Sequence, residues 1–324
     1  MSLFKEIGGY FELELNDFGS VYHDNLIALN SGRNAFKFIL LHKHYKKLYI
    51  PYYTCDVTLQ PLNDLGISYE FYRINQNFEP IDVSIEKEEA ILYVNYFGLM
   101  NRQVHEVVQK YRNVIIDNSQ AFFETSLQNI DTFYSPRKFF GLPDGGFAFC
   151  EKTIDLNLER DTNSISLMSH LLIRADHGVE VGYSEFKKND HAIDIQPLKK
   201  MSKLTEKLMR NIEYPKSQEV RIENFEYLHY HLKDQNEIAS IIENNDFKGP
   251  LVYPFMRKGN NKLRQNLINQ KIFTATYWPN VKDWINDKYS LEKYFMDNLI
   301  ALPIDQRYQK RDLNKVISII NGNI

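Results

Sequence analysis

Two segments 21 residues apart decide the expected fold. The first is VIIDNSQA, residues 114–121, and the second is SPRK, residues 135–138, which is followed by GLPDGG at residues 141–146. The first segment is an apolar strand that ends in a carboxylate, Asp117. The second is a short polar segment with one lysine, Lys138, closed by a glycine turn. Together they place an acid at a strand end and an amine a little further along the chain.

The residues before this pair alternate between strand and helix patterns. Apolar strand-like runs occur at residues 48–51, 67–72 and 90–95, and helical spacing occurs at 34–46, 54–65 and 101–112. The run at 90–95 is almost continuously apolar, which is typical of a strand buried on both faces. Regular alternation predicts an α/β fold, with a mostly parallel central sheet flanked by helices.

The pattern changes after the glycine turn. A strand is expected at 147–150 and helices at 155–178 and 196–212. From about residue 215 the expected elements are helices at 221–232, 262–269 and 312–320, with strands at 251–255 and 272–276. We therefore expect a large domain at residues 1–214 and a smaller C-terminal α+β domain at residues 215–324.

Composition excludes several classes of protein. The net charge of -3 over 324 residues argues against a broad nucleic-acid surface, and no apolar run is long enough for a membrane span. Two cysteines, Cys55 and Cys150, imply no disulfide framework, and no Cys/His cluster has the spacing of a zinc site. We expect a cytoplasmic protein without a metal.

The acid and the lysine suit one kind of chemistry. Pyridoxal phosphate needs a carboxylate to keep its pyridine nitrogen protonated and a lysine amine to form a Schiff base and move a proton. Asp117 and Lys138 have ordinary alternatives, a capping aspartate and a surface lysine. Similarly, Ser31 and Gly32 precede an expected helix, whose first N–H groups bind phosphate, but they also suit a simple N-cap.

Several short segments, taken in order, resemble motifs of the DegT/StrS family of pyridoxal-phosphate-dependent sugar aminotransferases, of aspartate aminotransferase fold type I. The resemblance spans most of the chain. The segments are SGRNA at 31–35, YIPYYT at 49–54, YVNYFG at 93–98, DNSQA at 117–121, SPRK to DGG at 135–146, KMS at 200–202 and LPI at 302–304.

The resemblance implies a role for each matching residue. Lys138 would carry the cofactor and shuttle protons, and Asp117 would pair with the pyridine nitrogen. Gln120 would lie near the cofactor ring, and Cys55 stands where the family often has an aromatic that stacks on it; Tyr52 or Tyr53 could replace that stacking. The implied phosphate contacts are Ser31, the backbone N–H groups of Gly32 and Arg33, and the hydroxyl of Ser135.

The implied reaction moves an amino group from an amino acid, typically glutamate, to a keto group of a nucleotide-linked sugar for surface polysaccharide synthesis. A homodimer is expected, because family sites form at a two-fold interface. Two alternatives stay open: a relative that dehydrates or deoxygenates the sugar, typically with histidine in place of lysine, and a non-catalytic relative. Substitution at Arg33, where the family has threonine, and at Cys55 motivates the second. Retention of Asp117 and Lys138 favours an aminotransferase.

Overall fold

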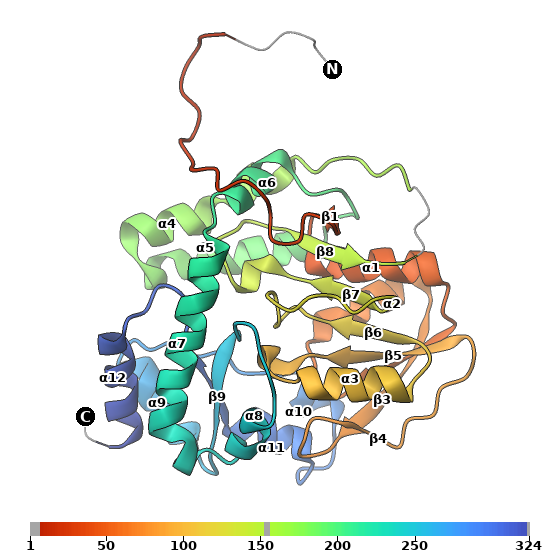
Figure 1. The fold of residues 1–324 in the computed structure, drawn as a ribbon, viewed down its shortest axis with the longest axis vertical. Helices are drawn as coiled ribbons and strands as arrows, with labels where there is room; N and C mark the ends of the chain where they lie inside the picture. Colours follow the sequence, from red (N-terminus) through yellow and green to blue (C-terminus); the bar gives the residue numbers. More distant parts are fainter. Residues whose placement is uncertain (1–6, 152–155, 323–324) are drawn as a thin grey trace.

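The computed structural model describes residues 7–151 and 156–322. Within these residues the main sheet has eight strands in the order β1-β8-β7-β6-β5-β2-β3-β4 (Figure 1). Neighbours from β7 through β3 are parallel, whereas β8, β1 and β4 pair in the antiparallel sense. The strands are β1 (Ile27–Leu29), β2 (Lys47–Pro51), β3 (Ser68–Ile74), β4 (Pro80–Ile81), β5 (Glu89–Val94), β6 (Val114–Asp117), β7 (Asp131–Tyr134) and β8 (Gly146–Phe149).

A smaller antiparallel sheet of β9 and β10 lies in the C-terminal part of the chain. Helices cover both faces of the main sheet, so the expected α/β fold with a mostly parallel sheet is confirmed. The remaining elements are α1 (Gly32–Lys43), α2 (Leu59–Leu65), α3 (Asn101–Lys110), α4 (Ser169–His177), α5 (Val179–Asp194), α6 (Lys203–Arg210), α7 (Tyr214–Leu232), α8 (Ala239–Glu243), β9 (Val252–Met256), α9 (Asn261–Asn269), α10 (Val281–Trp284), α11 (Leu291–Asn298), β10 (Leu299–Pro303) and α12 (Lys310–Ile320).

Local sequence explains where the key elements begin and end. The hydroxyl of Ser31 accepts a hydrogen bond of 3.1 Å from the Asn34 N–H and so caps α1. Gly66 ends α2 in the left-handed region, where glycine carries no steric cost. Every residue of β6 is buried, and its last residue, Asp117, is in register with Val94 and Phe133 of the flanking strands.

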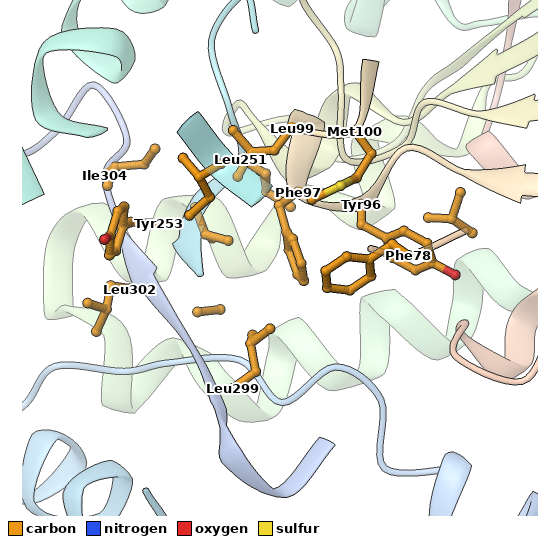
Figure 2. Packing of buried hydrophobic residues seen from close by; sticks show 14 of the residues in the cluster. Phe78, Tyr96, Phe97, Leu99, Met100, Leu251, Tyr253, Leu299, Leu302 and Ile304 are labelled. Carbon is orange, nitrogen blue, oxygen red and sulfur yellow. The ribbon is translucent and has the colours of Figure 1, made fainter. Parts of the chain in front are cut away.

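Two apolar clusters lie on opposite faces of the main sheet. One packs α1 and α2 against residues such as Leu48 and Ile115. The larger cluster fills the other face and continues into the C-terminal part, where Phe97 and Leu251 lie close to Leu302 (Figure 2). Residues on both sides of position 215 therefore share one core. The boundary at 214/215 remains our proposal, supported by the separate sheet that follows α7.

The structure corrects the expected helices between residues 151 and 212. Residue 155 lies outside the described residues, and residues 156–162 are not helical. Instead, α4 and α5 form a helical hairpin that turns at Gly178, whose φ of 86° ends α4, and only residues 203–210 of the second expected helix are helical. The prediction extended a helical pattern up to Gly178 without recognising that a second helix begins directly after that turn.

The expected strand at 272–276 is also wrong. Only Ala275 makes an isolated bridge, to Ala301, and the partner of β9 is β10, which the sequence analysis missed. The aromatic and β-branched residues that suggested a strand do not lie in a buried sheet, since Phe273 is 45% exposed. Among the described residues, no helix is long and apolar enough to cross a membrane.

Candidate active site

The carboxylate of Asp117 lies at the carboxyl end of β6, inside the molecule. Only 8% of the residue is exposed, and the Ser119 N–H donates a hydrogen bond of 2.7 Å to Oδ1. Burial raises the pKa of Asp117, while the ammonium of Lys138 acts in the opposite direction. A buried carboxylate is costly without a cation, so this position is suited to a positively charged partner.

Lys138 places its ammonium close enough to Asp117 to lower the pKa of the Asp117 carboxyl group electrostatically. It ends the short 3₁₀ turn Pro136–Lys138 that follows β7, and its exposed side chain enters a cavity of about 510 Å³. Burial raises the pKa of the Cys55 thiol to about 11, and the Lys138 ammonium opposes this shift as well. The ammonium of Lys138 therefore acts on both Asp117 and Cys55, although the three residues come from three separate segments.

The side chain of Gln120 follows β6 and has one N–H donor group, Nε2, without a hydrogen-bond partner among the described residues. Its Oε1 accepts a hydrogen bond of 2.7 Å from the Phe97 N–H, which fixes the amide. Gln120 is 1% exposed, and its Nε2 is buried without a hydrogen-bond partner among the described residues. An unsatisfied buried donor is costly, so a bound acceptor at this point is a physical expectation.

The predicted phosphate contacts also meet in space. A Cβ added to Gly32 would lie 2.9 Å from Cβ and 3.2 Å from Oγ of Ser135, so the first turn of α1 touches the segment that carries Lys138. The Gly145 N–H donates to the Asn30 carbonyl at 2.9 Å and holds the glycine turn against this contact. A helix start beside a serine hydroxyl is a suitable anion site.

The guanidinium of Arg33 is engaged elsewhere. It donates to Asp194 at 2.7 Å, to Gln60 at 3.0 Å and to the Ile193 carbonyl, and so ties α1 to the end of α5. The prediction for Arg33 therefore concerns its backbone N–H alone.

Neither tyrosine considered as a replacement for the missing aromatic is available. The ring of Tyr52 stacks on Phe71, with centroids 4.7 Å apart. Tyr53 is fully buried and packs edge-on against Trp278 at 4.9 Å. Cys55 is thus the residue from this segment that borders the site.

Two supporting residues escaped the sequence analysis. Asp144, fully buried beneath the glycine turn, accepts hydrogen bonds from the hydroxyls of Ser164 and Thr205, and burial raises its pKa. Its partners lie 20 and 61 residues away in sequence, so no local pattern reveals them.

The second missed residue is Arg221 of α7, which lines the Lys138 cavity and is 1% exposed. Its guanidinium lies 4.6 Å from the ring centre of Phe139 and donates to the carbonyls of Pro250 and Leu251. Burial lowers its pKa to about 10. An arginine among the apolar positions of a helix was the available signal in the sequence.

These residues fit pyridoxal phosphate. A buried carboxylate, a nearby amine, an unsatisfied amide donor and a helix start beside a serine correspond to the pyridine nitrogen, aldehyde, ring oxygen and phosphate of that cofactor. Among the described residues, no group of three His, Cys, Asp or Glu side chains could hold a metal ion.

Comparison with known proteins finds similarity in three-dimensional structure and none in sequence families. No protein-family model matches the sequence, and no curated protein matches it. Solved structures match along nearly the whole chain. NtdA from Bacillus subtilis, with bound cofactor PMP, has a TM-score of 0.65 at 18% identity, over 92% of this chain and 72% of its own.

Two further solved structures also match nearly the whole chain. A DegT DnrJ EryC1 StrS aminotransferase from Brucella abortus has a TM-score of 0.61 at 15% identity, over 92% of this chain and 85% of its own. The sugar aminotransferase CalS13 from Micromonospora echinospora has a TM-score of 0.62 at 13% identity, over 93% and 88%. The chain has the fold of the DegT/DnrJ/EryC1/StrS sugar aminotransferases. The resemblance noted in the sequence is therefore confirmed as a structural match, while identities this low show the fold alone.

Proposed function

We propose that the protein is a pyridoxal-phosphate-dependent aminotransferase that moves an amino group from an amino acid to a keto group of a nucleotide-linked sugar. The observation that carries the proposal is a buried carboxylate, Asp117, at the carboxyl end of β6, on which the ammonium of Lys138 acts from beside a cavity of about 510 Å³. The structural match to sugar aminotransferases supports the choice of substrate class.

Each residue of the site has a defined task in this proposal. Pyridoxal phosphate, when bound, supplies an electron sink for the bonds at the carbon that carries the amine. Asp117 would keep the pyridine nitrogen protonated, since a buried carboxylate would be stabilised by that charge. Lys138 Nζ would hold the cofactor through its aldehyde carbon, and the same amine would move the proton at the reacting carbon.

The other residues hold the cofactor in place. Gln120 Nε2 would donate to the ring oxygen, which would satisfy a donor that has no partner among the described residues. The phosphate would bind the N–H groups of Gly32 and Arg33 and the hydroxyls of Ser31 and Ser135. Cys55 borders the ring as a neutral group, because a thiol with a pKa near 11 is protonated at pH 7.

Glutamate as donor, a homodimer, a cytoplasmic location and a role in surface polysaccharide synthesis belong to the same proposal. They rest on the resemblance of the motifs and on the structural match. The reaction consumes a keto sugar and releases the 2-oxo acid of the donor.

Absorbance of the purified protein tests the assignment of Lys138. After incubation with pyridoxal phosphate, the wild-type protein gains the visible band of a lysine–cofactor adduct, which borohydride traps on Lys138. Lys138→Ala lacks the band and loses activity by more than about 10³-fold, as expected when a proton-transfer group is removed. Lys203→Ala, at an exposed lysine of α6, is the matched control and keeps both. A trapped adduct on any other lysine contradicts the proposal.

Addition of glutamate separates the proposal from its alternatives. Transamination removes the visible band and yields one 2-oxoglutarate for each site. A band that persists with glutamate favours dehydration or deoxygenation chemistry. Absence of cofactor binding at micromolar concentration favours a non-catalytic relative.

A further inference from the structure

The cavity beside Lys138 continues into a second cavity. The first has a volume of about 510 Å³ and the second of about 720 Å³. Arg174, Val179, Phe273 and Ala275 line both, so the two cavities form one groove between the α4–α5 hairpin and the segment after α9. Each volume lies in the usual range of a small-molecule site, and together they exceed the needs of an amino acid.

The part of the groove next to Lys138 carries excess positive charge. Six cationic side chains line it against two carboxylates, Asp305 and Asp312. Asp305 pairs with Arg307 at 2.7 and 2.8 Å, and Lys271 pairs at 3.0 Å with Glu180, which lines the second cavity. The six cations are Lys138, Arg174, Arg221, Lys271, Arg307 and Lys315.

Several of these cations lack an acidic partner. Arg221 donates to carbonyl and amide oxygens, and Lys315 donates to the Gln270 carbonyl at 2.9 Å. Within residues 7–151 and 156–322, the guanidinium of Arg174 makes no hydrogen bond or ion pair, although it acts electrostatically on Tyr308. Concentrated positive charge in a concave site favours a multiply charged anion.

The second part of the groove is apolar and aromatic. Tyr183 and Phe186 of α5 stack with ring centres 6.3 Å apart, and Phe273 lines the same cavity. These three residues are 54%, 41% and 45% exposed. Exposed aromatic faces that line a cavity are suited to stacking on a planar heterocycle.

We infer that the groove binds the nucleoside diphosphate part of the substrate. The diphosphate lies against Arg174 and Lys315, the base stacks among Phe273, Tyr183 and Phe186, and the sugar extends towards Lys138. This assignment rests on the proposed function and adds the residues that recognise the nucleotide. A single carboxylate, as in the amino donor, requires neither the surplus of cations nor the aromatic wall.

Calorimetric titration of the cofactor-loaded protein tests the groove with defined probes. UDP, dTDP and GDP are titrated separately, together with pyrophosphate and uridine. We expect at least one nucleoside diphosphate to bind at micromolar concentration. Arg174→Gln weakens both that ligand and pyrophosphate by about tenfold, whereas Phe273→Ala weakens the nucleotide and leaves pyrophosphate unchanged.

Lys188→Gln is the matched control on the same hairpin, because this lysine pairs with Glu185 and lies outside the groove. It binds the nucleotide as the wild type does. The inference is overturned if no nucleoside diphosphate binds, or if both groove variants bind as tightly as the wild type. With the Lys138 adduct intact, such a result refutes the groove alone, whereas nucleotide binding without any adduct refutes the proposed chemistry alone.

Discussion

The two ends of the proposed site are built differently. At the cofactor end, Asp117 and Gln120 are 8% and 1% exposed and are held by backbone hydrogen bonds. At the nucleotide end, Phe273 is 45% exposed on the segment after α9, and Tyr183 is 54% exposed on the α4–α5 hairpin. The difference separates chemistry, which needs fixed dipoles and charges, from recognition, which tolerates side chains that adjust on binding.

This contrast predicts larger effects on catalysis from substitutions at the buried end than from substitutions in the groove. A substitution at the buried end alters groups that cannot move, so the reaction itself suffers. A substitution in the groove removes one of several contacts with a ligand, so the loss appears in affinity. Kinetic measurements distinguish the two, because the first lowers kcat and the second raises KM.

The largest effect is expected for Asp117→Asn. The amide keeps the shape and the hydrogen bond from the Ser119 N–H but removes the charge that protonates the pyridine nitrogen. We expect kcat to fall by about 10²- to 10³-fold, the range for loss of one preorganised electrostatic group. Calorimetric affinity for the nucleoside diphosphate stays unchanged, since Asp117 lies outside the groove.

Stability without cofactor provides the control for Asp117→Asn. Burial raises the pKa of Asp117 above that of the unfolded chain, so the folded protein binds the proton more tightly. The free energy of unfolding contributed by this group therefore falls as pH rises through the aspartate range. At neutral pH the variant should unfold at the same or a higher temperature than the wild type. A clear loss of thermal stability would instead make Asp117 a structural cap.

The buried end was predictable because its residues are near one another in sequence and carry local patterns. The run at 114–117 is apolar and becomes β6, and the helix cap at Ser31 is a standard signal. These patterns made Asp117, Lys138 and the start of α1 candidates, and the resemblance to the sugar aminotransferase family selected them before any geometry was known. Only the structure shows that the Lys138 ammonium acts on Asp117 and that the start of α1 touches the Lys138 segment, since proximity across β6 and β7 depends on sheet order.

The groove was not predictable, because local patterns do not connect its residues. Its residues come from α4, α5, the segment after α9 and the C-terminal part, which no local pattern connects. The expected strand at 272–276 placed Phe273 in a sheet, and the misplaced helices hid the turn at Gly178 between α4 and α5. The arrangement of α4, α5 and the segment after α9 depends on contacts between residues far apart in sequence and on the positive φ of Gly178.

A smaller effect is expected for Gly32→Ala, which tests whether the buried end is as rigid as the contrast requires. The new Cβ would lie 2.9 Å from Ser135 Cβ, so the start of α1 and the Lys138 segment must separate. We expect a loss of about 1–3 kcal/mol in the free energy of unfolding, as for overpacking, and a clear rise in the dissociation constant of the cofactor. Denaturant titration and cofactor fluorescence measure the two quantities.

Gly141→Ala is the matched control for this substitution. Gly141 lies in the segment that connects Lys138 to β8, but its added Cβ would meet only a Leu171 methyl group at 3.8 Å. Cofactor affinity should stay within about twofold of the wild type, since that contact is ordinary packing. Equal losses in both variants would show that the segment is generally sensitive and that the contact at Gly32 has no special role.

The smallest effect concerns Cys55, a residue of the cofactor end on whose thiol the Lys138 ammonium acts. Because burial raises the pKa of its thiol to about 11, the thiol is neutral at pH 7 and is a poor nucleophile. Alkylation by iodoacetamide, followed by mass spectrometry, should be slow at pH 7, accelerate as pH approaches 11 and slow again when the cofactor is bound. Cys55→Ala should keep activity within about threefold, as expected for a neutral contact at the edge of a ring. Rapid alkylation at pH 7 would show a thiolate beside Lys138, and the fixed electrostatics assigned to the buried end would then be wrong.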